Sequence, residues 1–165
     1  IREDGLFGQA ELTSCGLNGG PLAGEGYYPS CIACHLFTDR PVIYVGDSDK
    51  PEYVNGSFPK IVKEGWDGDQ NEGYITNMYD QCTAGFRYFD LSHVSEITLT
   101  IRGYAYGSME IRTSFEGSAV KTIPLHYSNI WRDIKTEIKL PEGADSLYFT
   151  YRGPGSASFK GFTLK

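Results

Sequence analysis

Oxygen-bearing side chains gather in one short acidic stretch, Asp67-Gly-Asp-Gln-Asn-Glu72. Carboxylate and amide oxygens are the ligands that hard cations prefer, which makes Asp67 and Asp69 candidate calcium ligands. The stretch is not an EF-hand loop, because its sixth residue is Glu72 where that loop needs glycine. A solvated acidic turn is the alternative. A calcium ion bound here would have a structural role.

The chain carries four cysteines, Cys15, Cys31, Cys34 and Cys82. Cys31 and Cys34 have C-x-x-C spacing, but zinc normally needs a second close pair of ligands and only His35 is near. A redox role needs a strand-to-helix context that is missing here. If Cys31 to Cys34 is a strand, the two side chains point to opposite faces and cannot bond to each other. Free or buried thiols are the favoured interpretation, and disulfides or metal remain alternatives.

Motifs for catalysis are missing from the sequence. The three histidines, His35, His93 and His126, are dispersed, and neither G-x-S-x-G nor H-E-x-x-H occurs. Two carboxylates could serve as glycosidase acid and base, but no pair stands out among the 21 acidic residues. We therefore expect no independent enzymatic activity.

Charge and hydropathy exclude two classes of partner. The net charge is −6, and Lys and Arg are scattered without a basic stripe. Nucleic acid is therefore not expected, because phosphate contacts need clustered positive charge. No apolar run reaches 18 residues, so no membrane span is expected. The first residues, IREDGLFG, do not resemble a signal peptide, and the sequence leaves open a secreted or a bacterial cytoplasmic location.

Period-two alternation of apolar and polar residues predicts antiparallel strands in the second half of the chain. Leu147, Phe149 and Tyr151 share one face, for example, while Tyr148, Thr150 and Arg152 share the other. Turn sequences such as Pro141-Glu-Gly143 and Gly153-Pro-Gly155 separate the strands. The predicted strands are Phe86–Phe89, Glu96–Arg102, Ser108–Thr113, Ile134–Leu140, Leu147–Arg152 and Ser158–Leu164. The pattern is typical of an all-β antiparallel sandwich.

The first half of the chain is less regular. Gly8–Ser14 reads as a first strand and Gly16–Pro29 as a glycine-rich loop. Short strands are predicted at Ile32–Phe37, Pro41–Val45 and Phe58–Lys63. No linker or repeat is visible, so residues 1–165 are expected to form a single domain with an irregular insertion at about 16–65. The twelve tyrosines, nine phenylalanines and two tryptophans suit both strands and half-wet binding surfaces.

An ordered series of segments resembles the family 6 carbohydrate-binding modules, particularly those C-terminal to family 43 glycoside hydrolases. The matching segments are Gly8–Glu11, Tyr74–Met78, Ala84–Asp90, Gly107–Arg112, Ser128–Trp131, Pro141–Gly143, Ser146–Gly153 and Ser158–Leu164. The resemblance covers about residues 70–165 well and the start weakly. It implies a jelly-roll, galactose-binding-like sandwich that holds xylan, β-glucan or related chains.

The resemblance also implies where sugar binds. In the family, two aromatic rings among the loops at one end clamp a sugar ring, and by position these are Tyr74 and Trp131. Pyranose C–H faces are apolar and stack on such rings. The family's sugar-binding Asn aligns with Ser158, which has less reach. Its calcium-binding Asp of the last strand aligns with Lys160, which weighs against calcium held there with Glu11.

A second sugar site of the family lies on the concave sheet face. Tyr148 and Arg152 lie there on the polar face of one strand, and Tyr104 and Tyr106 flank the turn before another. This surface suits either a sugar or a docked catalytic domain.

Two functions remain open at this level. The first is non-catalytic binding of plant cell-wall polysaccharide, xylan, arabinoxylan or β-glucan, that targets an attached glycoside hydrolase. The second is a structural accessory domain that packs on a family 43 catalytic domain and binds no sugar itself. The expected partners are a polysaccharide or oligosaccharide and a catalytic domain in the same chain.

Overall fold

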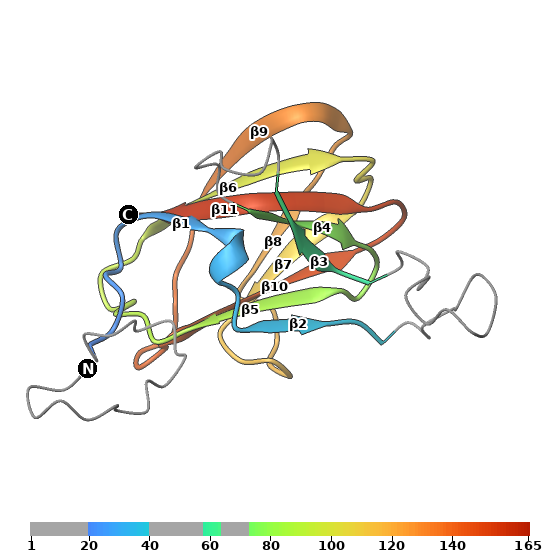
Figure 1. The fold of residues 1–165 in the computed structure, drawn as a ribbon. Coiled ribbons are helices and arrows are strands. Elements are labelled where there is room, and N and C mark those ends of the chain that lie inside the picture. Colours follow the sequence, from blue (N-terminus) through green and yellow to red (C-terminus); the bar gives the residue numbers. More distant parts are fainter. Residues whose placement is uncertain (1–19, 40–57, 64–72) are drawn as a thin grey trace, which may run out of the picture.

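The computed structural model describes residues 20–39, 58–63 and 73–165, which form two antiparallel sheets (Figure 1). One sheet has the order β3-β4-β11-β6-β9, with β1 also paired to β11, and the other has the order β2-β5-β10-β7-β8. The strands are β1 (Gly26–Pro29), β2 (His35–Phe37), β3 (Lys60–Val62), β4 (Tyr74–Met78), β5 (Thr83–Arg87), β6 (Glu96–Gly103), β7 (Ser108–Arg112), β8 (Lys121–Pro124), β9 (Ser128–Glu137), β10 (Ser146–Arg152) and β11 (Ala157–Leu164). A short 3₁₀ turn, η2 (Ser30–Ile32), joins β1 to β2.

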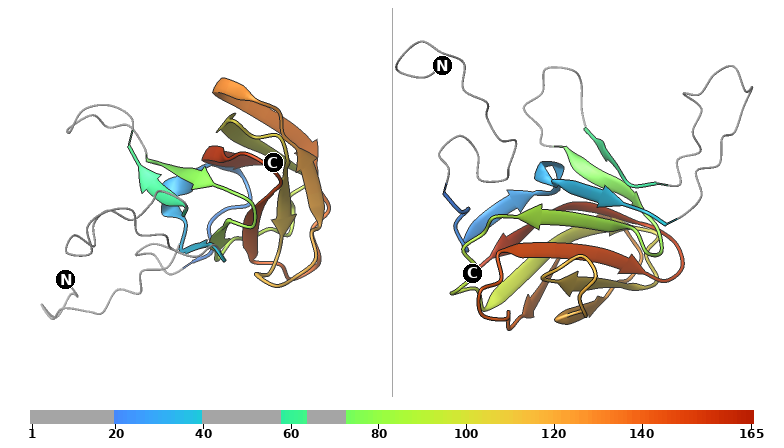
Figure 2. Two further views of the ribbon diagram at one scale, coloured as in Figure 1. Left: turned by 90° about the vertical axis from the view of Figure 1, so that its right-hand side faces the viewer. Right: turned by 90° about the horizontal axis from the view of Figure 1, so that it is seen from below.

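The core lies between the two sheets, which appear as two curved layers in Figure 2. Alternation places every second side chain inward, as in β6, where Ile97, Leu99 and Ile101 are buried. Phe86 of one sheet meets Phe162 of the other with ring centroids 5.0 Å apart. Edge-to-face packing of this kind adds to the burial of apolar area. The expected all-β sandwich is therefore confirmed.

The two predicted strands whose bounds differ most show why bounds are hard to predict. β5 ends at Arg87 because Tyr88 adopts a left-handed conformation with φ 68°, so the expected strand Phe86–Phe89 is shifted. The expected strand Ile134–Leu140 instead begins at Ser128 and ends at Glu137, where its partner β6 begins at Glu96. Pairing with β6, rather than the apolar pattern of β9 itself, fixes the length of β9.

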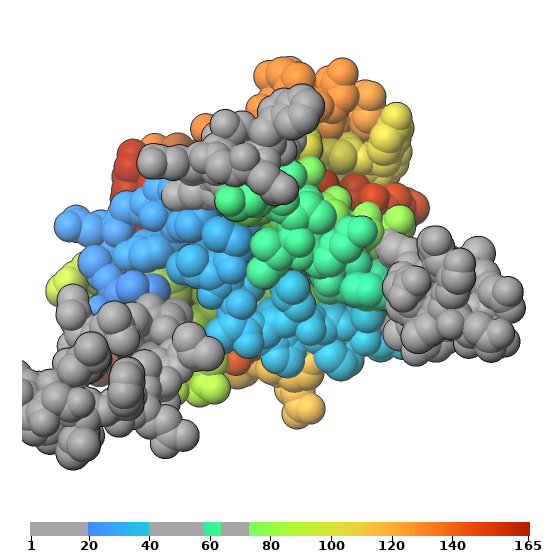
Figure 3. All heavy atoms as spheres, viewed as in Figure 1, coloured from blue at the N-terminus to red at the C-terminus, as the bar shows by residue number. Residues whose placement is uncertain are grey.

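The first half of the chain adds the edge strands β2 and β3 to the two sheets, and it adds β1 beside β11 inside one of them. β1, β2 and β3 pair with β11, β5 and β4, respectively. In Figure 3 these segments, coloured blue to teal, cover much of one face of the molecule. The described parts of the expected insertion at 16–65 thus complete the sandwich, and Gly26–Pro29, expected as loop, is a strand. The expected strands Gly8–Ser14 and Pro41–Val45 lie outside the described residues.

The loops of the sandwich gather at two opposite ends. The loops 104–107, 125–127 and 153–156 join β6 to β7, β8 to β9 and β10 to β11, and we call them the tyrosine end. The β10–β11 turn is at the far right of Figure 1. The loops 88–95 and 138–145, which we call the carboxylate end, lie at the other end of β10. Within the described residues, no helix is long and apolar enough to cross a membrane.

Candidate functional site

The structure brings together the two aromatic residues that the sequence singles out. Tyr74 lies on β4 and Trp131 on β9, both half-buried on the outer face of the same sheet. Their ring centroids are 5.2 Å apart and their planes meet at 79°. Because the rings touch edge to face, no gap for a pyranose remains between them. A sugar ring would have to lie on the outer surface of the pair, so the clamp geometry expected from the resemblance is not formed.

Two cations lie over the Trp131 ring. The guanidinium carbon of Arg102 is 4.2 Å from the ring centroid, and the Lys160 ammonium is 5.8 Å from it. Arg102 Nη2 also donates a hydrogen bond of 3.0 Å to the Tyr74 hydroxyl. Cation–π contacts of this kind are worth about 0.5–1 kcal/mol at exposed sites. Arg102 therefore ties the two rings into one cluster.

Ser158 lies on β11 opposite Arg102 of β6. Its hydroxyl is 3.0 Å from that of Thr76, so either can donate to the other. Ser158 also lines a pocket that Arg102 shares. The predicted roles of Tyr74, Trp131 and Ser158 in sugar binding stay predictions that their placement on one surface supports.

Three exposed tyrosines belong to the tyrosine end near this cluster. Tyr104, Tyr106 and Tyr127 are 66%, 62% and 46% exposed. Tyr127 lies between the other two, with centroids 5.0 Å from Tyr104 and 6.4 Å from Tyr106. Large exposed aromatic groups are uncommon unless a surface binds something. The three rings form a ledge at the end of the sandwich.

A pocket of about 310 Å³ joins this ledge to the cluster around Trp131. Its lining includes Tyr104 and Tyr127 of the ledge together with Arg102 and Ser158. Asn129 also lines the pocket. Its exposed amide can donate and accept hydrogen bonds. Stacking surfaces and directed polar groups thus meet in one place.

Backbone hydrogen bonds hold the tyrosine end in place before any ligand arrives. The buried Tyr151 hydroxyl donates to the Pro154 carbonyl at 2.5 Å and accepts from the Tyr106 N–H at 3.2 Å. The Ser156 N–H donates to the Tyr104 carbonyl at 3.2 Å. Burial raises the pKa of the Tyr151 hydroxyl, so it stays protonated and able to donate. The loops that carry two ledge tyrosines are therefore fixed to each other.

A glycine makes this close contact of loops feasible. Gly155 has φ +84°, and a Cβ atom there would lie 1.7 Å from the Tyr104 carbonyl oxygen. Only glycine combines that conformation with such an approach. The Gly153-Pro-Gly155 turn, which the sequence marks only as a separator, therefore positions Tyr104.

Sequence reasoning missed Tyr127 and Asn129, and it placed Tyr104 and Tyr106 beside a different site. Tyr127 is not part of an alternating apolar and polar pattern, because it lies in a loop between β8 and β9. A usable signal was present: each of these tyrosines lies within four residues of a strand end, where loops converge.

The second expected surface, around Tyr148 and Arg152, is not open. Tyr148 is only 9% exposed, and its ring lies 6.1 Å from Phe115 and 6.3 Å from His35. Arg152 Nε pairs with the Glu110 carboxylate at 3.2 Å. The expectation of a wet face at Tyr148 is therefore wrong, because a turn and strand β2 bring aromatic rings over it. A sugar-binding role for these two residues stays a prediction.

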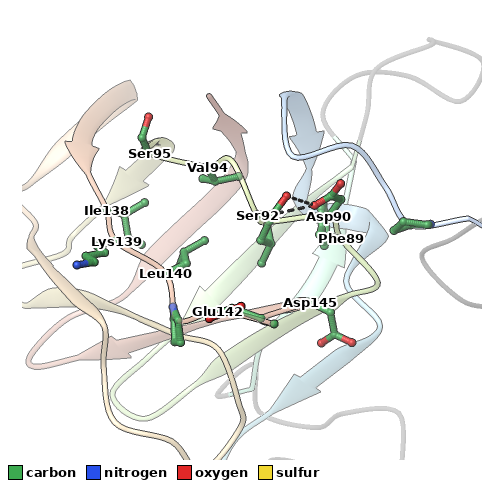
Figure 4. A pocket seen from close by; sticks show the side chains of 15 residues that line it. Phe89, Asp90, Ser92, Val94, Ser95, Ile138, Lys139, Leu140, Glu142 and Asp145 are labelled. Carbon is green, nitrogen blue, oxygen red and sulfur yellow. Dashed lines mark hydrogen bonds between the residues drawn. The ribbon is translucent and has the colours of Figure 1, made fainter.

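The carboxylate end holds a larger pocket of about 890 Å³, shown in Figure 4. Asp90, Glu142 and Asp145 lie around it, and Ser92 donates hydrogen bonds to Asp90. These hydrogen bonds hold the pKa of Asp90 below its usual value. The one aromatic ring in its lining belongs to Phe89, which is 2% exposed. Among its described lining residues, the pocket thus offers no free ring for stacking.

The structure tests the metal and cysteine hypotheses only in part. Glu11, Asp67, Asp69 and Cys15 lie outside the described residues, so calcium stays a prediction. Across 20–39, 58–63 and 73–165, no group of three or more metal-binding side chains occurs. Cys31 and Cys34 carry free thiols, and Cys82 is buried. Burial raises the pKa of the Cys34 thiol, which disfavours its reactive thiolate.

Two antiparallel sheets with an aromatic surface at one loop end define the class: the chain has the fold of the family 6 carbohydrate-binding modules. A module of that family from Clostridium stercorarium, solved in complex with cellobiose, superposes with a TM-score of 0.66 at 11% identity, over 89% of this chain and 98% of that one. A family 43 arabinoxylan arabinofuranohydrolase from Bacillus subtilis, in complex with cellotetraose, gives 0.62 at 15% identity, over 88% of this chain and 28% of that one. The expected family 6-like fold is confirmed.

The sequence itself is similar to part of a longer protein. It is 46% identical over 164 residues to a xylosidase/arabinosidase of Thermoclostridium stercorarium, over 99% of this chain and 34% of that protein. The chain thus spans about a third of the curated relative that it matches. No family model matches the sequence.

Proposed function

We propose that this domain binds plant cell-wall polysaccharide without catalysis and targets an attached glycoside hydrolase to it. The ligand is a β-linked chain, xylan, arabinoxylan or β-glucan. The observation that carries this proposal is the ledge of Tyr104, Tyr106 and Tyr127, fixed around a pocket at the end of the sandwich. The names of the relatives, a cellobiose-bound module, an arabinoxylan arabinofuranohydrolase and a xylosidase/arabinosidase, support this ligand class.

The chemistry of the ledge suits a neutral sugar. The C–H faces of a pyranose lie on tyrosine rings, while its equatorial hydroxyls need polar groups at fixed positions. Tyr127 offers the central ring, and Asn129 and Ser158 offer polar atoms in the adjoining pocket. Because hydrogen bonds already fix the loops, binding loses little conformational entropy there.

The same pocket does not suit hydrolysis. A glycosidase needs two carboxyl groups on either side of the scissile bond. The described residues that line the pocket include neither Asp nor Glu. The proposed role is therefore binding, with chemistry supplied by another domain.

Replacing the central ring tests the proposal. Tyr127→Ala should weaken binding of xylo-oligosaccharide or cello-oligosaccharide by about 1–3 kcal/mol, which is roughly fivefold to 150-fold. Isothermal titration calorimetry on the full chain measures this. Phe37→Ala is the matched control, because Phe37 is 39% exposed on the opposite sheet. Unchanged affinity in Tyr127→Ala, or an equal loss in Phe37→Ala, would contradict the ledge as the binding surface.

Trp131→Ala is a separate test of the sequence-predicted pair. If a sugar ring lies on the outer surface of Tyr74 and Trp131, this change should also cost about 1–3 kcal/mol of binding. The loss should be small if these rings only support the pocket. Calorimetry with the same oligosaccharides separates the two, and circular dichroism checks that the sheet is intact.

A structural accessory role is the second candidate. It is favoured by an aromatic cluster on the outer face of the other sheet, where Phe37 and Phe115 have centroids 5.1 Å apart and Phe37 remains 39% exposed. Such a patch suits docking on a family 43 catalytic domain. This role predicts no retention of the isolated domain on xylan or β-glucan affinity gels.

Calcium remains a proposal for the acidic stretch and Glu11. A structural ion that binds only the folded state would raise the melting temperature when calcium is added and lower it in chelator. A melting temperature that neither calcium nor chelator moves would exclude a stabilising ion.

A further inference from the structure

A concentration of positive charge over Trp131 has no obvious role in binding neutral sugar. The protein carries a net charge of −6, yet two cations from different strands, Arg102 of β6 and Lys160 of β11, lie over one indole ring. Within the described ranges, Lys160 makes no ion pair, whereas Lys135 on the same sheet pairs with Glu96 at 2.6 Å. The Lys160 charge is therefore available to a ligand.

The position of Lys160 results from an irregularity in the sheet. The pairing of β11 with β6 shifts register between Phe159 and Gly161, so Lys160 lies in a bulge. Bulges re-aim side chains, and here the ammonium points over the indole ring.

Arg102 connects this cation pair to the proposed sugar site. Its guanidinium contacts Trp131 and also lines the pocket that Tyr104 and Tyr127 border. A polysaccharide backbone on the ledge would thus bring its substituents within reach of Arg102 and Lys160. A substituent that carries a carboxylate fits this surface, because its negative charge can meet the two cations that lie over the indole ring.

We propose that Arg102, Lys160 and Trp131 bind a uronic acid substituent, so that the preferred ligand is an acidic polysaccharide such as a glucuronic-acid-substituted xylan. This inference rests on the proposed function, since the ledge holds the backbone. The Lys160 ammonium supplies a point charge to the carboxylate, and Arg102, which also donates to the Tyr74 hydroxyl, adds a second positive charge beside it. An acidic surface of a partner domain is the competing occupant, and the test below separates the two.

Calorimetry on the full chain with two xylo-oligosaccharides of equal backbone length tests the proposal, one neutral and one carrying a single glucuronic acid. The acidic oligosaccharide should bind about threefold to tenfold more tightly at low ionic strength. This preference should shrink as salt rises, because salt screens an exposed charge pair. Lys160→Gln should remove most of the preference, measured as the ratio of the affinities of that variant for the acidic and the neutral oligosaccharide.

Lys139→Gln is the control, because it removes the same charge from an exposed lysine at the carboxylate end and should leave the preference intact. Equal binding of both oligosaccharides by the unaltered protein would overturn the uronate proposal while the proposed function stands. Failure of both to bind would overturn the two together and leave an acidic partner domain as the occupant. A preference that survives Lys160→Gln would also overturn it.

Discussion

The two ends of the sandwich differ in what they expose and in how firmly they are built. The carboxylate end has the larger pocket, about 890 Å³ against about 310 Å³ at the tyrosine end. Its aromatic ring, Phe89, is nevertheless 2% exposed, whereas Tyr104 at the other end is 66% exposed. Pocket volume and exposed aromatic surface thus point to different ends, and the proposed function rests on the exposed rings.

The glycines of the two end turns show how the backbone is built for these roles. Gly155 and Gly143 both adopt positive φ, +84° and +75°. A Cβ at Gly155 would strike the Tyr104 carbonyl, whereas a Cβ at Gly143 would have nothing within 4 Å. The tyrosine end thus depends on a close backbone contact that the carboxylate end lacks at the matching position.

The largest expected effect comes from alanine at these two glycines. Gly143→Ala should cost about 1 kcal/mol of stability, because only the left-handed conformation is penalised. Gly155→Ala should cost more than that and should also abolish oligosaccharide binding, because the Tyr104 loop must move. Thermal unfolding and calorimetry on both variants measure the difference. Equal losses of stability, or retained binding in Gly155→Ala, would contradict the fixed-loop account.

A smaller effect is expected from the hydroxyl that fixes the tyrosine end. Tyr151→Phe removes one hydrogen bond to Pro154 and one from Tyr106, which should cost about 1–2 kcal/mol of stability. Binding should weaken as well, because the loops become less ordered. Tyr148→Phe in the same strand is the control for stability, since the Tyr148 hydroxyl makes no hydrogen bond with a described residue and its loss should change stability little. Unaltered binding in Tyr151→Phe would show that the order of these loops does not limit the affinity for oligosaccharide.

Local patterns predict the strands well because each inward-facing set repeats within a few residues, as Leu147, Phe149 and Tyr151 do in β10. They fail where distant segments decide the outcome. Tyr148 reads as exposed from its own strand, yet His35 of β2 and Phe115 of a turn cover it. These contacts depend on which strands become neighbours, and alternation does not encode that.

The candidate site was likewise predictable only in part from the sequence. Resemblance to a family placed Tyr74 and Trp131 on one surface, and their rings do meet. The edge-to-face contact and the Arg102 guanidinium between them depend on side-chain packing across four neighbouring strands. Tyr127 was missed because a lone loop residue has no periodicity, and only the convergence of three loops makes it central.

The smallest expected effect is on stability at acid pH, where the carboxylates of Glu110 and Asp90 can be compared. Burial disfavours the charge of Glu110, but hydrogen bonds and charges from Arg112 and Arg152 outweigh burial and hold the pKa below its usual 4.5. The Asp90 carboxylate at the other end also has a lowered pKa, chiefly through hydrogen bonds from Ser92, but it is fully exposed. A lowered folded-state pKa stabilises the protein above the unfolded-state value, and this contribution declines as pH falls through the folded-state value.

Glu110→Gln should therefore lower stability at neutral pH and flatten its decline below about pH 4.5. Asp90→Asn should change the same curve much less, because water screens an exposed charge. Urea unfolding of both variants at a series of pH values measures this. Arg152, which pairs with Glu110, is the last residue of β10. The residues that follow it form the turn of the tyrosine end. A larger acid effect from Asp90 would mean that the carboxylate end is the more firmly built of the two, which reverses the comparison.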